Sequence, residues 1–365
     1  MTTKTALNPV RETLKLGQSL WYDGLIAPED LQKMIREDGL RGATTNPTIF
    51  EKALSGTAHD IEVKRLLKEG HSEESVYQTI AIRTVQQVAD VFLPVYEESR
   101  GTDGFVSMEV SPLLAYDTAA TAAEAKDLYR RLGRKNVMIK IPATREGIPA
   151  VEETIAEGIS VNVTLIFSIE RYLEVMAAYA AGIEKRLSRN ESVAEIASVA
   201  SFFVSRVDSM VDKKLEEKIR SGAASKNLLG QAAVANAKAA YAEFERFFFS
   251  ARWEKIRAAG AQIQRPLWAS TGTKNPAYSD VLYVESLIGA HTVNTMPPAT
   301  LDAFRHHGVA ASHLTENQAR AAQVLKEVSA AGIDLNEVTE ELEKAGVVSF
   351  KESYLKIIEC IGAKK

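Results

Sequence analysis

The stretch VMIKIPAT, residues 137–144, contains a single lysine, Lys140, in an otherwise apolar run that predicts a buried strand of a parallel sheet. Lysine is almost never fully buried unless its charge is paired or its amine is used. Two interpretations are open at this point. Lys140 ends the strand beside Pro142 and extends its ammonium to solvent, or it is an amine nucleophile. In the second case, removal of water lowers the pKa of the amine, and the neutral nitrogen attacks a carbonyl to form a Schiff base.

Short apolar runs alternate with longer helical patterns along the chain, which predicts an α/β fold with parallel strands. The eight strand candidates are residues 19–23, 41–46, 105–110, 137–141, 159–165, 198–204, 266–270 and 291–295. The helical patterns between them include residues 74–98, 119–132, 169–187 and 207–219, with Asp117 and Ser168 as candidate N-caps. Eight parallel strands with intervening helices most simply close into a (β/α)8 barrel, also called a TIM barrel.

The chain has 365 residues, which exceeds the size of about 250 that is usual for such a barrel. The surplus is helical. The helical patterns in these additional residues predict an insertion of two helices at about residues 226–260 and a C-terminal helical extension at about residues 312–365. Because we find no Pro/Gly/Ser-rich linker and no long repeat, we expect residues 1–365 to form one decorated domain.

Composition excludes several classes of function. The content of hydrophobic residues is 45% and the formal net charge is −4, so the chain lacks the basic surplus of a nucleic-acid-binding protein. No window approaches the roughly 18 apolar residues of a membrane span, and the N-terminus has no apolar core typical of a secretion signal. The single cysteine, Cys360, suits a reducing compartment. We therefore expect a cytoplasmic protein without nucleic-acid or membrane partners.

Polar residues lie at the carboxyl ends of the predicted strands, which open onto one face of a barrel and carry the chemistry of barrel enzymes. They are Asp23, Asn46, Glu109, Lys140, Asn162, Thr164, Ser201, Arg206 and Ser270. Each alone is typical of a helix cap or a turn. Caps would not, however, bring one lysine, two acids and a cluster of amides and hydroxyls to a single rim.

Five motifs resemble the successive motifs of the transaldolase family, in the same order and spacing from residue 19 to about residue 298. They are GATTNPTIF (residues 42–50), VSMEV (106–110), VMIKIPAT (137–144), NVTLIFS (162–168) and SFFVSRVD (201–208). The resemblance implies a class I, Schiff-base (β/α)8 enzyme that needs no metal and no cofactor. Such an enzyme moves a dihydroxyacetone unit from sedoheptulose 7-phosphate to glyceraldehyde 3-phosphate, giving erythrose 4-phosphate and fructose 6-phosphate.

The resemblance also implies a role for each matching residue. Lys140 corresponds to the Schiff-base lysine, and Asp23 to the carboxylate that takes and returns the proton of the C4 hydroxyl. Glu109, through a water held by Thr164, corresponds to the group that moves protons during imine formation. The residues that correspond to the substrate-binding set are Thr44, Asn46, Asn162, Ser201 for the C1 hydroxyl, Phe203 for the dry wall of the site and Arg206 for the phosphate.

One segment departs from the family pattern. Where many transaldolases have Ser-Phe-Arg after the seventh strand, this chain has STGTKNP, residues 270–276, and so lacks a second phosphate-binding arginine. We expect Lys274 to supply the second positive charge, with Ser270 and the backbone of residues 271–273 as donors. The alternative is that Lys274 is a solvated lysine in a polar turn.

Three other functions remain to be weighed. Fructose 6-phosphate aldolases, which release dihydroxyacetone, are similar but much shorter and carry Gln and Tyr where this chain has Glu109 and Phe203. A non-catalytic barrel would not need the complete set of lysine and acids. A metal-dependent aldolase is not supported, because the six histidines form no ligand motif such as H-E-x-x-H. The sequence does not decide between a monomer and a homodimer.

Overall fold

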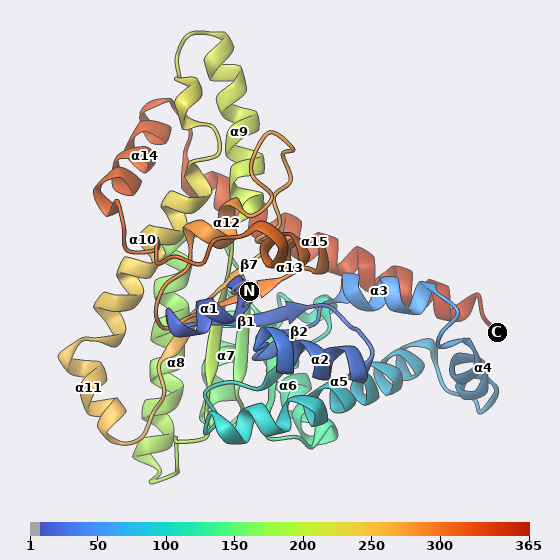
Figure 1. Cartoon of the computed structure of the whole chain (residues 1–365). Helices are drawn as coiled ribbons and strands as arrows, with labels where there is room; N and C mark the ends of the chain where they lie inside the picture. The colour runs from blue at the N-terminus through green and yellow to red at the C-terminus, as the bar shows by residue number, and fades with distance from the viewer. Residues whose placement is uncertain (1–7) are drawn as a thin grey trace, which may run out of the picture.

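A closed barrel of parallel strands lies at the centre of the computed structural model, which describes residues 8–365 (Figure 1). The strands follow chain order around the barrel, and β8 pairs with β1 to close it. They are β1 (Gln18–Asp23), β2 (Gly42–Thr44), β3 (Phe105–Glu109), β4 (Val137–Pro142), β5 (Val161–Ile166), β6 (Ser198–Phe203), β7 (Gln264–Ala269) and β8 (Thr292–Met296). All eight predicted strands and the (β/α)8 fold class are confirmed.

Helices connect the strands and surround the barrel. Those before β4 are α1 (Pro9–Lys15), α2 (Pro28–Asp38), α3 (Pro47–Ser55), α4 (Asp60–Lys68), α5 (Glu73–Glu98), η1 (Pro112–Leu114) and α6 (Thr118–Leu132). Those from β4 to β7 are α7 (Gly147–Ala156), α8 (Ile169–Ser188), α9 (Ser205–Arg220), η2 (Lys226–Leu228), α10 (Ala232–Phe248) and α11 (Ala251–Ala258). After β7 follow α12 (Leu282–Ser286), α13 (Pro298–His307), α14 (Gln318–Ala330) and α15 (Leu335–Gly362).

The predicted caps begin two of these helices. Asp117 accepts a hydrogen bond from the backbone N–H of Ala120 at 2.9 Å and begins α6. Ser168 accepts from the N–H of Arg171 at 3.0 Å and begins α8. Each side chain satisfies one of the free N–H groups of the first helical turn, which is worth about 1 kcal/mol.

The second strand is shorter than predicted. We expected residues 41–46, whereas β2 ends at Thr44. Asn46 is the N-cap of α3: its Oδ1 accepts a hydrogen bond from the N–H of Ile49 at 3.0 Å, and Pro47 follows in the first helical turn. The strand therefore ends before Asn46. As the N-cap, Asn46 belongs to the start of α3 and does not pair with a neighbouring strand.

The fifth strand contains an irregularity at the mouth of the barrel. Its pairing with β6 shifts register between Val163 and Ile166. Leu165, inside this bulge, has a φ of 60° and is buried. A positive φ is uncommon for a leucine, and bulges of this kind re-aim neighbouring side chains at active sites.

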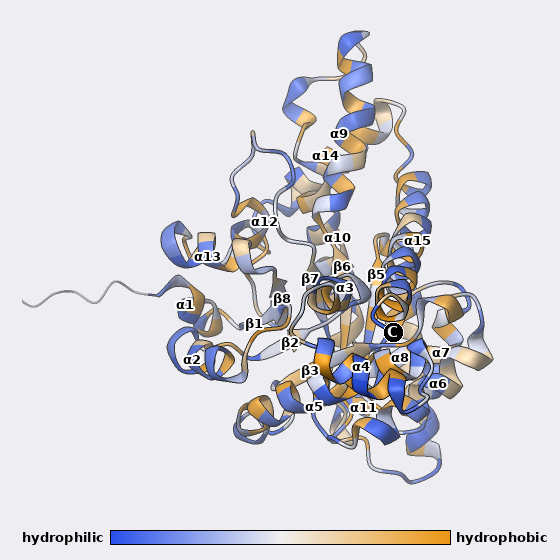
Figure 2. Cartoon of the chain, turned by 90° about the vertical axis from the view of Figure 1, so that its right-hand side faces the viewer, coloured by the Kyte–Doolittle hydropathy of each residue, from blue (hydrophilic) through white to orange (hydrophobic). Residues whose placement is uncertain are grey.

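The outer helices are amphipathic, and Figure 2 shows hydrophilic and hydrophobic residues mixed along them. On α6, for example, the buried residues Ala125, Leu128 and Leu132 recur at helical spacing and face the barrel. No helix within residues 8–365 is both long enough and apolar enough to cross a bilayer.

Both surplus segments of the chain are helical. The insertion consists of α10 and α11 with the short η2, and α10 packs on α8, α9 and α14 (Figure 1). In the extension, the long α15 packs on α3, α5, α9 and η1. Because α3 and η1 follow the carboxyl ends of β2 and β3, α15 lies across the mouth of the barrel. We propose that barrel and extension form one domain, since α15 contacts helices from both halves of the chain.

Candidate active site

Three neighbouring strands place predicted residues side by side inside the barrel. Glu109 on β3 is in register with Lys140 on β4, and Lys140 is in register with Asn162 on β5. Register partners on adjacent strands point to the same face of a sheet, and neighbouring strands lie about 4.8 Å apart. The acid, the lysine and the amide therefore form one row near the mouth.

Lys140 is enclosed rather than extended to solvent. Its Nζ lies 3.3 Å from Oε2 of Glu109, and both side chains are 5% exposed. It donates a hydrogen bond to the backbone carbonyl of Thr45 at 3.2 Å and lies over the ring of Phe350, 5.5 Å from the centroid. The interpretation in which Lys140 extends into water is therefore wrong.

The two predicted acids hold protons more readily than ordinary carboxyls. Burial raises the pKa of Asp23 and of Glu109, and in both cases the positive charge of Lys140 opposes the shift. Oδ1 of Asp23 also accepts a hydrogen bond from Oγ1 of Thr44 at 2.7 Å. A carboxyl whose pKa moves toward neutrality is suited to general acid/base work.

Glu109 in this row and Thr164, two residues after Asn162 on β5, each have a buried side-chain oxygen with no hydrogen-bond partner among residues 8–365. Oγ1 of Thr164 is buried and unpartnered, and Oε2 of Glu109 has only the ion pair with Lys140, whose direction does not make a hydrogen bond. A cavity of about 20 Å³ adjoins Glu109, with Tyr77 and Glu124 in its wall. This volume is large enough for one water molecule.

Hydrogen bonds fix the orientation of the amide in the row. Nδ2 of Asn162 donates to Oγ of Ser107 at 2.9 Å, and its Oδ1 accepts from Oγ of Ser201 at 2.7 Å. Next to Ser107 in register, Thr44 on β2 shares a hydrogen bond of 2.6 Å between hydroxyls with Thr295 on β8. Ser107 and Thr295 were not predicted. Ser107 could have been found, because it lies two residues before Glu109 and alternation along a strand puts both on one face.

The predicted phosphate ligand Arg206 lies in the first turn of α9. Its guanidinium stacks over the ring of Phe203, 5.4 Å from the centroid, and Phe203 packs on Phe167 at 5.1 Å. Burial lowers the pKa of Arg206, but an arginine remains charged at neutral pH. The stacking orients a permanent cation at the rim.

The segment after β7 is tied to the start of α9. Ser270 has a φ of 55°, and its hydroxyl shares a hydrogen bond of 2.9 Å with that of Ser205, whose N–H donates to the carbonyl of Ser270 at 3.1 Å. Lys274 is exposed and lines a cavity of about 240 Å³ with Asp212. Its charge also acts to lower the pKa of Asp23, against the larger effect of burial.

The predicted residues thus converge on one end of the barrel, although Lys274 stands apart at the surface. Phe350 could not have been found from sequence, because a phenylalanine at helical spacing is typical of packing. Within residues 8–365, no group of three His, Cys, Asp or Glu side chains is arranged to hold a metal ion.

Comparison with known proteins finds relatives over nearly the whole chain. Residues 20–361 match the family model described as Transaldolase/Fructose-6-phosphate aldolase. Proteins named transaldolase from Saccharopolyspora erythraea and Mycobacterium tuberculosis are each 46% identical, the matches covering 99% and 97% of this chain and 98% and 97% of theirs. One from Trichodesmium erythraeum is 42% identical, covering 98% of this chain and 97% of its own.

Proposed function

The chain belongs to the transaldolase/fructose-6-phosphate aldolase family, and from this premise we propose how its barrel residues perform the transaldolase reaction. A dihydroxyacetone unit passes from sedoheptulose 7-phosphate to glyceraldehyde 3-phosphate, giving erythrose 4-phosphate and fructose 6-phosphate. The observation that carries the proposal is the buried contact of 3.3 Å between Lys140 and Glu109. It joins an amine to the acid that can deprotonate it.

Imine formation begins when the ammonium of Lys140 gives a proton to Glu109. The free nitrogen attacks C2 of the donor, and the carbonyl π electrons move to oxygen. One proton then passes from nitrogen to this oxygen through a water, for which the hydroxyl of Thr164 is a ligand. Glu109 protonates the resulting hydroxyl, which leaves as water while the nitrogen lone pair closes the iminium. The unpartnered oxygens of Thr164 and Glu109 support this water site.

Carbon–carbon cleavage follows. Asp23 removes the proton of the C4 hydroxyl, the C3–C4 bond breaks, and its electron pair moves through C2 to the iminium nitrogen, leaving an enamine and a free aldehyde. In the second half-reaction, C3 of the enamine attacks the acceptor aldehyde, whose oxygen takes the proton back from Asp23. Water then releases the product ketose from Lys140. The raised pKa of Asp23 supports its service as both base and acid.

The remaining polar residues hold the sugar. Asn162 and Ser201, linked at 2.7 Å, bind the hydroxyls near C1. The Oδ1 of Asn46 caps α3, so its amide group is left to donate to the substrate. Thr44 orients Asp23, and Phe203 forms the apolar wall that excludes water.

Arg206 binds the substrate phosphate, because a guanidinium offers paired donors to phosphate oxygens. Lys274 adds a second positive charge, with Ser270 at the end of β7. The exposure of Lys274 and its electrostatic effect on Asp23 support this role. We also propose a cytoplasmic location, which the use of a single cysteine supports.

Borohydride trapping tests the proposal. Reduction in the presence of fructose 6-phosphate should fix the imine, and peptide mapping should find the label on Lys140. The variant Lys140→Ala should neither trap the donor nor transfer the three-carbon unit, because no other group supplies the iminium. Label on a different lysine would contradict the assignment.

The acceptor dependence separates this activity from that of a fructose 6-phosphate aldolase. With fructose 6-phosphate alone, the enzyme should hold the dihydroxyacetone unit as the enamine and release little of it. Adding erythrose 4-phosphate should start turnover. Steady release of free dihydroxyacetone without an acceptor would favour the aldolase.

A further inference from the structure

The C-terminal helix brings an aromatic ring to the reacting nitrogen. Nζ of Lys140 lies over the ring of Phe350 on α15, 5.5 Å from its centroid. Both residues are 4% exposed, so bulk water does not weaken the contact. A cation within about 6 Å of a ring centroid is attracted by the negative face of the ring, most strongly where the pair is desolvated.

The helix holds Phe350 in place from both sides. Four residues before it, Gly346 packs on the Leu165 bulge so closely that a Cβ at this position would lie 2.8 Å from a leucine methyl group. Four residues after it, Tyr354 packs edge-on against Tyr77 at 5.6 Å. These contacts lie on one face of α15, since residues four apart in a helix are neighbours.

Ser353 adds a polar contact to this face. Its hydroxyl shares a hydrogen bond of 2.9 Å with that of Thr48 on α3. Together these contacts fix the ring over the lysine more firmly than packing of Phe350 alone would do.

The ring matters most after the imine forms. The ammonium of Lys140 has three N–H donors: one forms a hydrogen bond with the carbonyl of Thr45 at 3.2 Å, while the carboxylate of Glu109, 3.3 Å away, forms an ion pair. A protonated imine retains the positive charge but only one N–H. The attraction of the ring needs no N–H at all, so it persists when two of the three donors are lost.

We propose that Phe350 stabilises the iminium on Lys140 through the face of its ring, so that α15 contributes an electrostatic element to the active site. The proposal rests on the proposed Schiff-base function. It assigns to the C-terminal extension a part in the chemistry beyond covering the mouth. The ring favours the cationic iminium over the neutral enamine and the carbinolamine, neither of which carries charge on the nitrogen.

Fluorination of the ring tests the proposal without changing the fold. Phenylalanine analogues with one, two and three fluorine atoms, incorporated at position 350, keep the shape of the ring while progressively removing its negative face. The equilibrium fraction of enzyme that borohydride traps with fructose 6-phosphate should fall stepwise along the series. At saturating donor, the ratio of the cationic iminium to the neutral enamine should fall by about tenfold for the trifluorinated ring, as expected for a desolvated cation–π contact.

The same series at Phe92, a fully buried residue of α5, is the control and should show no trend. Equal ratios of iminium to enamine at saturating donor across the series at position 350 would overturn the proposal and leave Phe350 a packing residue. The variant Phe350→Leu should lose trapping to at least the same extent as the trifluorinated enzyme. The unmodified enzyme tests the underlying function separately, because absence of label on Lys140 there would defeat the Schiff base itself.

Discussion

Asp23 and Glu109 flank one lysine but occupy different environments. Glu109 contacts the nitrogen directly, at 3.3 Å, while Asp23 is held by the hydroxyl of Thr44 at 2.7 Å. Burial is the largest cause of the raised pKa of both. Because burial raises the pKa of both acids, we expect them to divide their tasks by position, one at the nitrogen and the other at the C4 hydroxyl.

Single substitutions should separate these tasks. Asp23→Ala should still form a trappable imine with fructose 6-phosphate, because the nitrogen retains Glu109, but it should not cleave the C3–C4 bond. Glu109→Ala should form the imine slowly. Each substitution should lower kcat by about 10²- to 10⁴-fold. Rapid-quench borohydride trapping measures the imine, and equal wild-type rates of trapping in both variants would contradict the division.

Lys274 can be tested through the charge of the substrate. Lys274→Ala should lower kcat/KM for fructose 6-phosphate and erythrose 4-phosphate while leaving slow turnover of unphosphorylated fructose and glyceraldehyde nearly unchanged. The loss should shrink as salt rises, because the ammonium is exposed. Lys213, which lines the same cavity, is the matched control. Equal losses of kcat/KM with phosphorylated and unphosphorylated substrates would support the alternative that Lys274 is a solvated lysine in a polar turn.

Sequence could predict residues whose type conflicts with their surroundings. Lys140 is an example, since an apolar strand has no structural need for an amine. Phe350 carries no such conflict: a phenylalanine in a helix is expected to pack, and only the fold brings it to the lysine. The same holds for the carbonyl of Thr45, because a backbone group has no signature in sequence.

At the scale of elements, α9 connects Arg206, the proposed phosphate ligand, to the insertion. Asp208 accepts hydrogen bonds from the N–H of Ala233 at 2.7 Å and from the hydroxyl of Tyr283 at 2.9 Å. Asp212, one turn later, accepts from the N–H of Gly230 at 3.0 Å and from the hydroxyl of Tyr278 at 2.7 Å. The two carboxylates thus attach two segments to α9, the helix of Arg206. One segment is the start of α10, and the other is the loop of Lys274.

This arrangement predicts a dependence of stability on pH. Burial, with the nearby charge of Asp212, raises the pKa of Asp208 to about 6, whereas an unfolded aspartate titrates near about 3.9. Between these pH values the folded state binds a proton that the unfolded state lacks. The contribution of Asp208 to the free energy of unfolding therefore falls as pH rises through this window and is constant above it.

The variant Asp208→Asn cannot ionise, so its free energy of unfolding relative to wild type should increase from pH 4 to pH 7. The increase should be at most about 3 kcal/mol, measured by urea unfolding at a series of pH values. Asp212→Asn should change in the same direction, because burial raises the pKa of that carboxyl as well. If the difference in the free energy of unfolding between Asp208→Asn and wild type does not vary with pH, the raised pKa of Asp208 in the folded state is contradicted.

Element boundaries were less predictable than element types. The apolar runs identified every strand, because alternation with amphipathic helices leaves few other topologies. The predicted strand at residues 41–46 is too long, because TTNP, residues 44–47, is as typical of the end of a strand as of the start of a helix. The hydrogen bond from Ile49 to Asn46 decides for the helix.

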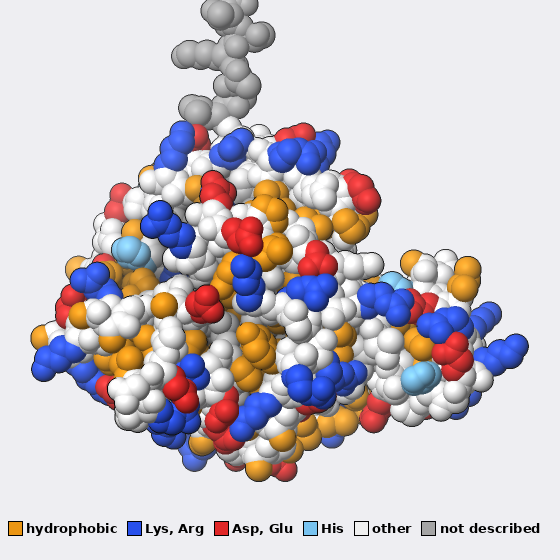
Figure 3. Space-filling model, turned by 90° about the horizontal axis from the view of Figure 1, so that it is seen from below, with side chains coloured by type: hydrophobic (Ala, Val, Ile, Leu, Met, Phe, Trp, Pro, Cys, Tyr) orange, Lys and Arg blue, Asp and Glu red, His pale blue; other side chains and the backbone are white. Residues whose placement is uncertain are grey.

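Across the whole molecule, chemistry and stability occupy opposite ends of the barrel. Seen from below relative to Figure 1, the surface of the molecule carries acidic and basic side chains interspersed, with no large block of one sign (Figure 3). The site lies at the carboxyl ends of the strands. At the amino ends, Arg265 on β7 and Asp103 before β3 form an ion pair of 2.9 Å, with side chains 15% and 13% exposed.

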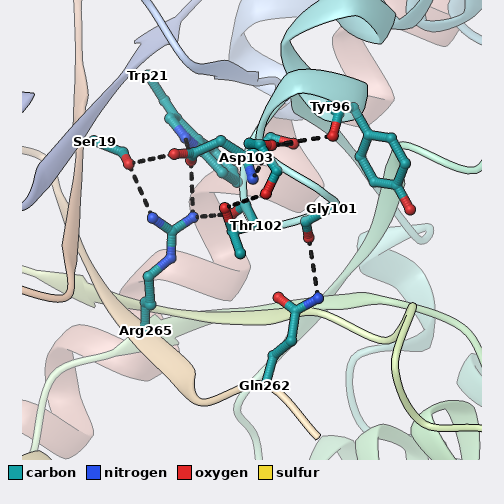
Figure 4. A network of polar contacts seen from close by, with 9 residues as sticks. Ser19, Trp21, Tyr96, Gly101, Thr102, Asp103, Gln262 and Arg265 are labelled. Atoms are coloured by element: carbon teal, nitrogen blue, oxygen red, sulfur yellow. Dashed lines mark hydrogen bonds and ion pairs between the residues drawn. The ribbon is translucent and has the colours of Figure 1, made fainter. Parts of the chain in front are cut away.

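A network of hydrogen bonds surrounds this ion pair (Figure 4). Asp103 accepts from the hydroxyl of Ser19 at 2.6 Å and from the indole N–H of Trp21 at 3.2 Å. Arg265 donates to Ser19 at 2.9 Å and to the carbonyl of Thr102 at 2.6 Å. The network links β1, β7 and the segment before β3 at the amino ends of the strands. No predicted site residue belongs to it, and its members follow no motif, so sequence did not indicate it.

Removing the cation should therefore cost stability and spare catalysis. Arg265→Met leaves the carboxylate of Asp103 largely buried without its partner. Loss of one member of a fully buried pair costs about 3–5 kcal/mol, and the partial exposure of this pair reduces the expected loss to about 2 kcal/mol. The kcat/KM for transfer should stay within about twofold, because residues at the amino ends of barrel strands serve stability rather than chemistry.

Two further variants make this prediction specific. Adding Asp103→Asn to Arg265→Met removes the unpaired charge while keeping one of the two oxygens that accept from Ser19 and Trp21, and should recover part of the lost stability. Arg252→Met breaks an exposed ion pair with Glu184, whose side chains are 62% and 42% exposed, and should cost less than about 1 kcal/mol. Urea unfolding gives the three stabilities and a coupled assay gives the activity. A fall in kcat/KM that exceeds tenfold for Arg265→Met in the folded protein would mean that the two ends of the barrel are coupled.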